Sequence, residues 1–264
     1  MVNMDYSIVD TFTNTPFSGA QSAVCALDAW PDDALLTKIA AEFNLDCTTF
    51  FVPKGDAFEL KWFSGAGELS NMKYSLLAAA FVLQNEGAAA ERFVFHTRNG
   101  RFTIERAGEC LALPLPAIEV ESRALRRDMI VSLGGALPLS VCCGRDLVFI
   151  MEDEDAVRKI KPDFTAMKAL PEGYGVFVAA VGRDTDIAAR AFWPKIGINE
   201  DTVCGSMYAN LGPLFQKKLH KGTLTARQLS ARGGELLLKV EADTIRLCGK
   251  AVLSSSGTMF VPGL

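Results

Sequence analysis

A short segment of the sequence combines an acid, a thiol and the start of a helix. It runs from Asp201 to Ser206, and an apolar helical pattern follows it to about Leu219. Backbone N–H groups at a helix start, with the positive end of the helix dipole, form a binding site for a carboxylate. A thiol there is expected to have its pKa lowered from about 8.5, which would make Cys204 a thiolate base, and Asp201 is a second acid or base candidate. The alternative is an ordinary capped helix, with Ser206 as the cap and Cys204 packed in the core.

Other common chemical sites are absent from the sequence. It has no GxxxxGK[ST] phosphate loop and no GxGxxG after a strand, since the loop at 65–67 lacks the third glycine. The two histidines, His96 and His220, lie far apart, and no CxxC pair occurs. We therefore expect no metal site built from histidine and cysteine.

The composition is that of an ordinary globular protein. Of the 264 residues, 49% are hydrophobic and 22% are charged, and the net charge is -4. Because Lys and Arg are not clustered, we expect no nucleic-acid partner. No stretch approaches the roughly 18 apolar residues of a membrane span, and no signal peptide is visible, so no membrane partner is expected. The seven scattered cysteines indicate reduced thiols and a cytoplasmic location.

The elements expected around the opening segment occur once in each half of the chain. An aromatic strand, a loop with an acid and an apolar helix follow one another at 61–84 and again at 190–219. Other strands are expected at 6–12, 23–27, 48–52, 58–63, 92–97, 102–106, 110–115, 146–151, 176–181, 235–240, 244–247, 250–253 and 258–261, and helices at 31–43 and 125–133. This pattern predicts a duplicated α+β chain with much antiparallel sheet and a helix enclosed in each half.

Two prolines mark the expected domain boundary. Pro114 and Pro116 close a strand-like run, and a polar stretch follows them. We therefore predict an N-terminal domain at 1–116 and a C-terminal domain at 117–256, with the last strand, 257–264, as a candidate addition to the first.

Short segments along almost the whole chain, taken in their order and spacing, carry a family resemblance. They lie at 9–13, 16–19, 23–25, 39–45, 62–63, 192–194, 197–201, 205–206 and 228–234. The chain resembles the PhzF-like family, named for the phenazine-biosynthesis isomerase, of the diaminopimelate epimerase and proline racemase superfamily. The resemblance implies two pseudo-symmetric domains, each a mostly antiparallel sheet wrapped around a central helix, with the active site between them. It also implies proton-transfer isomerisation of a small carboxylate without metal or organic cofactor, and a homodimer by analogy.

Among the candidate site residues, four depart from the family pattern and two keep it. The family's Asn-Leu-Ser-Glu-Thr carries its catalytic Glu, and Cys47 stands at that position. Tyr74 and Tyr208 replace the family's two histidines, and Cys204 replaces a threonine, whereas Asp201 and the serine at 206 are retained. A thiol near 8.5 is a far weaker proton donor than a carboxylic acid near 4.3, so Cys47 does not reproduce the role of the glutamate.

These substitutions suggest a relocated two-thiol site. Cys47 and Cys204 would act on opposite faces of one carbon, one as thiolate and the other as thiol. The remaining site residues are expected to bind the substrate carboxylate and shape the pocket, namely Gly205, Ser206, Lys73, Tyr74, Ser75 and Tyr208. Two alternatives stay open: an isomerase that uses Asp201, Tyr74 or a single cysteine, and a non-catalytic member that binds a small acid, in which Cys47 is a small buried residue.

Overall fold

The structure is a computed structural model that describes residues 2–88 and 90–262. The chain forms two compact units: unit 1 comprises Met1–Leu113 and Cys248–Leu264, and unit 2 comprises Pro114–Leu247. The predicted boundaries at 116 and 256 lie further along the chain. The second differs because 250–253 and 258–261, predicted as separate strands, form one continuous strand, β17 (Ala251–Val261), which pairs with β1 (Val2–Thr11).

Unit 1 is a mixed sheet with two helices. Besides β1 and β17, it contains β2 (Ala20–Ala26), α1 (Asp33–Phe43), β3 (Thr48–Lys54), β4 (Ala57–Ser64), β5 (Gly67–Leu69), α2 (Tyr74–Asn85), β6 (Arg92–Thr97) and β7 (Gly100–Ala107), followed by β8 (Cys110–Pro116). Along the series β17-β1-β2-β3-β4-β6-β7 the pairings are antiparallel, antiparallel, parallel, antiparallel, parallel and antiparallel.

Unit 2 has the same succession of pairings. Its elements are β9 (Glu121–Arg123), α3 (Arg127–Ser132), β10 (Ser140–Cys143), β11 (Leu147–Ile150), α4 (Glu154–Lys159), α5 (Phe164–Ala169), β12 (Val176–Ala180), β13 (Ile187–Phe192), the 3-10 turns η1 (Pro194–Ile196) and η2 (Gly205–Met207), α6 (Tyr208–Leu219), β14 (Thr223–Gln228), β15 (Gly234–Val240) and β16 (Thr244–Gly249). Along β9-β10-β11-β12-β13-β14-β15 the order of antiparallel and parallel pairs repeats that of unit 1. The predicted α+β fold and its duplication are confirmed.

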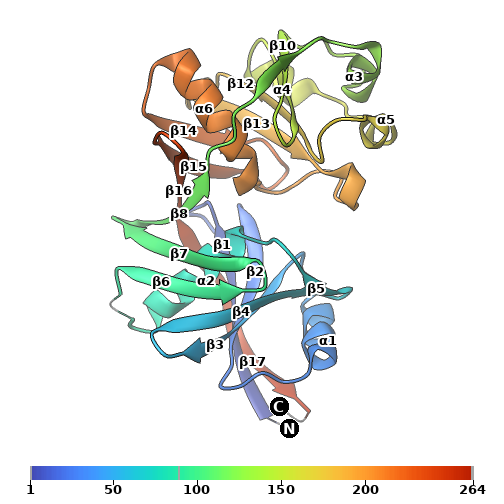
Figure 1. The fold of residues 1–264 in the computed structure, drawn as a ribbon. Helices are drawn as coiled ribbons and strands as arrows, with labels where there is room; N and C mark the ends of the chain where they lie inside the picture. Colours follow the sequence, from blue (N-terminus) through green and yellow to red (C-terminus); the bar gives the residue numbers. More distant parts are fainter. Residues whose placement is uncertain (1, 89, 263–264) are drawn as a thin grey trace. The chain divides into compact units, whose positions relative to one another are not determined.

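In each unit, one helix connects the strands of the second parallel pair. α2 lies between β4 and β6 in the chain, and α6 lies between β13 and β14 (Figure 1). α2 contacts β1, β2, β3, β7 and β17 and is buried along most of its length, as expected for a helix that is apolar on nearly all sides. The predicted enclosed helices are therefore present, and each begins next to a segment with candidate site residues.

A proline inside α6 is accommodated by a neighbouring segment. Pro213 has no N–H to donate within the helix, which leaves the carbonyl of Ala209 without its usual partner. That carbonyl accepts a hydrogen bond from the N–H of Ile118 at 2.9 Å. Gly212 faces Ile245 so closely that an added Cβ would meet its Cδ1 at 2.6 Å. Both features hold α6 tightly against the rest of unit 2.

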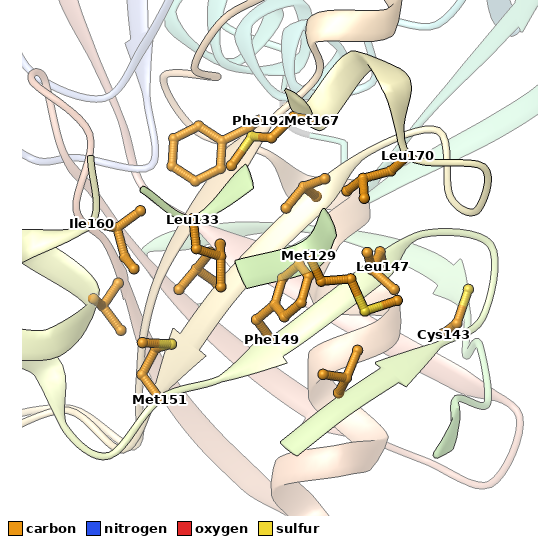
Figure 2. Packing of buried hydrophobic residues seen from close by; sticks show 14 of the residues in the cluster. Met129, Leu133, Cys143, Leu147, Phe149, Met151, Ile160, Met167, Leu170 and Phe192 are labelled. Atoms are coloured by element: carbon orange, nitrogen blue, oxygen red, sulfur yellow. The ribbon is translucent and has the colours of Figure 1, made fainter. Parts of the chain in front are cut away.

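The core of unit 2 lies under its outer helices. Met129 of α3 and Met167 of α5 pack with Leu147 and Phe149 of β11 and with Phe192 of β13 (Figure 2). Successive strand residues point to opposite faces, so Leu147 and Phe149 leave the other face of the sheet to their neighbours in β11. Burial on both faces explains why this strand is a continuous apolar run.

None of the helices in the described part of the chain has both the length and the hydropathy that crossing a bilayer needs.

Candidate active site

The loop from Asp201 to Cys204 is held by one buried side chain. Gln228, at the end of β14, is fully buried. Its Nε2 donates to the carbonyl of Asp201 at 2.8 Å, and its Oε1 accepts from the N–H of Cys204 at 2.7 Å. A single amide therefore fixes both ends of the loop that carries the predicted acid and thiol.

Further contacts fix the same loop from three sides. Ser230 Oγ donates to the carbonyl of Thr202 at 2.5 Å. Arg190 forms a two-pronged ion pair with Glu200, at 2.7 and 2.9 Å. Such a pair fixes direction as well as distance. The N–H of Asp201 donates to the carbonyl of Ala191 at 2.9 Å, so the loop is well ordered before any ligand binds.

The carboxylate of Asp201 lies at the edge of an indole ring. Its Oδ2 accepts a hydrogen bond from Nε1 of Trp193 at 3.1 Å. Asp201 is partly exposed, whereas Trp193 is buried. The indole N–H thus orients a carboxylate that solvent or a ligand can still reach.

The thiol of Cys204 differs from its predicted state. The residue is 4% exposed, and its Sγ lies 3.4 Å from Ser206 Oγ. Burial first, and then the charge of Asp201, raise the pKa of Cys204 well above the ordinary range of a thiol. The predicted lowering of its pKa is therefore wrong, because loss of hydration outweighs the helix start. At neutral pH this thiol carries its proton and can donate it.

Tyr208, one turn further along, places an unsatisfied hydroxyl beside this thiol. The residue is fully buried, and its hydroxyl has no hydrogen-bond partner among the described residues. Burial raises the pKa of Tyr208 well above its usual value, and the charge of Asp201 adds to the effect. A buried unpaired hydroxyl costs about 1–3 kcal/mol. Such a group is a candidate donor to a bound ligand.

Tyr208→Phe is expected not to destabilise the free protein, since it removes this unpaired hydroxyl. The free energy of unfolding should stay level or rise, by up to about 1–3 kcal/mol, in urea denaturation. Tyr74→Phe is the matched control, because the Tyr74 hydroxyl donates to the carbonyl of Gln21 at 3.4 Å and its removal should lower stability slightly. A clear loss of stability in the Tyr208 variant would show that its hydroxyl has a partner in the free protein.

The predicted site residues of unit 1 gather at the start of α2. Cys47 precedes β3 and is fully buried, with Sγ 3.7 Å from Thr49 Oγ1. Burial raises the pKa of Cys47 to about 11, although hydrogen bonds from Thr49, Ser75 and Ser22 partly offset the effect. Cys47 is therefore also a protonated thiol at neutral pH, and neither predicted thiol is the thiolate that the two-thiol hypothesis requires in the free protein.

The other predicted residues of unit 1 form the first turn of α2 and its cap. Ser75 Oγ donates to the carbonyl of Met72 at 2.7 Å and closes the first turn. Lys73 Nζ lies 5.5 Å from the centroid of the Phe102 ring. In unit 1, the structure thus places Cys47 next to Ser75. In unit 2, it brings together Asp201, Cys204, Ser206 and Tyr208.

Three contributors to the unit 2 site were not identified as functional from the sequence. Gln228 and Trp193 stood only within segments that carry the family resemblance, and Arg145, discussed below, carried no signal. Gln228 and Arg145 reach the loop from positions far away in the sequence, which no local pattern reveals.

Among the described residues, neither a cluster of metal ligands nor the cavity of unit 1 marks the candidate site. No cluster of three or more His, Cys, Asp or Glu side chains suited to a metal ion occurs among them. A cavity of about 800 Å³ in unit 1 is lined by β1, β2, β17 and the segment around Trp30, and it contains none of the predicted site residues. The chemistry described above, rather than cavity size, therefore defines the candidate site.

Comparison with known proteins gives a consistent assignment. The family profile described as "Phenazine biosynthesis-like protein" matches residues 9–257. An uncharacterized isomerase of Pseudomonas aeruginosa is 38% identical over 258 residues, which cover 97% of this chain and 98% of the relative. A crystal structure of a PhzF-family protein from Enterococcus faecalis has a TM-score of 0.95 and 38% identity, covering 98% of this chain and all of that one. A hydroxyproline epimerase of Agrobacterium vitis shares the fold alone, with a TM-score of 0.59 and 11% identity over 97% of this chain and 92% of its own.

Proposed function

Because the chain belongs to the phenazine biosynthesis-like family, we propose that it is an isomerase that transfers a proton on a small carboxylate or amino-acid-like substrate, using its own side chains and no cofactor. Relatives of similar length from Pseudomonas aeruginosa and Halalkalibacterium halodurans are named uncharacterized isomerases, which supports an isomerase-type activity. The choice of proton transfer rests on the side chains of unit 2.

One observation carries the proposal: Asp201 and the protonated thiol of Cys204 stand in one rigid loop. The charge of Asp201 helps to keep the proton on Cys204, so the pair combines a base and an acid at the same pH. Gln228 holds the backbone of both residues. In the proposed reaction, Asp201 removes a proton from the carbon next to the substrate carboxylate, and Cys204 donates its proton to the resulting enolate-like intermediate. Proton exchange with solvent then restores the Asp201 carboxylate and the Cys204 thiol.

The start of the helical segment stabilises the negative charge that develops in this reaction. Gly205 and Ser206 open the turn that leads into α6, and N–H groups in a first turn have no partner within the helix. Removing a proton beside a carboxylate places negative charge on its oxygens. Donors fixed in advance around those oxygens lower the barrier. The unpaired hydroxyl of Tyr208 adds a further candidate donor.

The residues of unit 1 form a second set whose part in the reaction is tested separately. Cys47 remains the candidate second thiol, and Lys73, Tyr74 and Ser75 are candidate binding residues. If Cys47 takes part, its proton makes it a donor in the free protein rather than a base.

The test is hydrogen exchange in heavy water. The protein is incubated with L- and D-amino acids and small 2-hydroxy acids in deuterium oxide, and loss of the α-hydrogen signal is followed by proton NMR. An isomerase of this kind replaces the α-hydrogen of at least one acid with deuterium. Binding in saturation-transfer NMR without exchange would instead identify a small-acid-binding protein, and neither binding nor exchange would refute the proposal.

A further inference from the structure

An arginine next to the candidate site is held by a buried carboxylate. Asp146 is fully buried, and its Oδ1 accepts from the N–H of Gly175 at 2.9 Å. Its Oδ2 accepts from Nε of Arg145 at 2.7 Å and lies 2.6 Å from Nη2. The guanidinium carbon lies 5.6 Å from the centroid of the Trp193 ring. One edge and one face of the guanidinium are therefore fixed, although the side chain is 35% exposed.

The same guanidinium reaches the start of the helical segment. Nη2 of Arg145 also donates to Ser206 Oγ at 3.2 Å, and that oxygen lies 3.4 Å from the sulfur of Cys204. The indole of Trp193, against which the guanidinium packs, donates to Asp201. Ser206 thus links Arg145 to Cys204, the proposed acid, and Trp193 links it to Asp201, the proposed base.

The internal duplication shows that this position lies at a helix start in both units. Thr48 of β3 pairs with Ala23 of β2, and Val176 of β12 pairs with Leu147 of β11, at the same places in the two sheets. Counting back two residues from Ala23 and Leu147 makes Gln21 the equivalent of Arg145. The carbonyl of Gln21 accepts from the hydroxyl of Tyr74 at the first position of α2.

The environment of Arg145 is specific to unit 2. Thr48 and Val176 pair onward with Phe63 and Phe192, so the next residues, Ser64 and Trp193, are equivalent. The residue before Val176 is Gly175, where an added Cβ would meet the Trp193 ring at 2.8 Å. Its equivalent in unit 1 is Cys47. In unit 2, Gly175 leaves room for the indole of Trp193, and that indole packs against the guanidinium of Arg145. In unit 1, the position equivalent to Arg145 holds the uncharged Gln21.

A fixed guanidinium at this place suits one kind of ligand group. Nη1 of Arg145 has no hydrogen-bond partner among the residues that the structure describes. Guanidinium groups match the planar geometry of carboxylates and bind them by charge-assisted hydrogen bonds. We propose that Arg145 binds the substrate carboxylate beside Cys204 and thereby selects acids over their uncharged amides, an inference that rests on the proposed function.

The test compares an acid with its amide in the same protein. The acid is the member of the panel above with the fastest exchange or, without exchange, the strongest saturation transfer, and its partner is the primary amide. In Arg145→Met, KM for the acid should rise about 10- to 100-fold, with a much smaller change in kcat, because a charge-assisted hydrogen bond is lost. KM for the amide should stay nearly unchanged. Arg145→Lys, which keeps the charge without the fork, should give an intermediate KM.

The control is Arg227→Met. The Arg227 side chain is also 35% exposed and ion-paired, to Glu235, and it points to the opposite face of β14 from the buried Gln228. This variant should keep the wild-type preference for the acid. The ratio of the two KM values is measured within one protein, so a partly unfolded variant does not distort it.

The possible outcomes separate this inference from the proposed function. Exchange in Arg145→Met with an unchanged preference for the acid overturns the role of Arg145 and leaves the isomerase in place. If no acid exchanges with the wild-type protein, the isomerase fails. Saturation transfer then decides the inference alone: acids that bind the wild-type protein but not Arg145→Met support it, and equal or absent binding overturns it.

Discussion

Asp201→Asn is expected to slow exchange of the substrate α-hydrogen by about 10²- to 10⁴-fold, the usual contribution of a positioned general base. The amide can still accept the hydrogen bond from Trp193, so the loop should keep its place. It cannot take a proton. The measurement is the initial rate of deuterium incorporation at saturating substrate, with unfolding in urea as a check on the fold.

A second readout in this variant tests the electrostatic link to Cys204. The charge of Asp201 contributes to the raised pKa of that thiol, so removing the charge should lower the pKa. Any residual exchange should then fall off at a lower pH than in the wild-type protein. Asp184→Asn is the control, because Asp184 is exposed and makes only a 3.9 Å ion pair with Arg227. Wild-type exchange in Asp201→Asn would remove Asp201 from the mechanism.

Cys204→Ser is expected to lower the same rate by about 10²- to 10⁴-fold, because a hydroxyl is a much weaker proton donor than a thiol. In the wild-type protein, the raised pKa keeps the proton on the sulfur through neutral pH. A donor loses activity as pH rises through its pKa, so the wild-type rate should decline only above the ordinary thiol range. The pH profile of the variant should lack that decline.

Two other cysteines complete this experiment. Cys143→Ser removes a buried thiol from the core of unit 2 and should leave turnover unchanged, which separates chemistry from packing. Cys47→Ser tests the two-thiol hypothesis directly. A loss equal to that of Cys204→Ser would support a thiol pair, whereas full turnover would make Cys47 a structural residue. Full turnover in Cys204→Ser would contradict the proposed role of this thiol as the proton donor.

The predicted site residues that the structure brings together in unit 2 lie within one stretch of chain. Asp201, Cys204 and Tyr208 fall together because a loop and the first turns of a helix place neighbours in sequence side by side in space. Their ionisation could not be inferred from the same stretch, because burial depends on what covers it. Helix-start reasoning predicts a lowered pKa for Cys204, and burial of the thiol in the folded protein raises its pKa instead.

The fold likewise divides into elements with a strong local sequence pattern, which were predicted, and features that depend on distant residues, which were not. Strands with strong apolar patterns, such as β6 and β12, lie within about a residue of their predicted bounds. β14 was not predicted, because only Leu224 and Ala226 mark its inner apolar face and the remaining residues read as polar. As a result, the sequence pattern does not identify Gln228, the residue that fixes the loop from Asp201 to Cys204. Pairing partners such as β1 and β17, from opposite ends of the chain, are likewise invisible to local periodicity.

The pairing of β1 with β17 has a consequence for how the chain is made. β1 pairs with β2 on one side and with β17 on the other, and the start of β1 and the end of β17 lie together in Figure 1. A ribosome releases β17 after every residue of unit 2. Unit 1 therefore begins before unit 2 and is completed after it, and the edge of β1 that pairs with β17 has no native partner until β17 is made. Open strand edges pair readily with other chains, so newly made unit 1 has a risk of aggregation at this edge that contiguous unit 2 does not have.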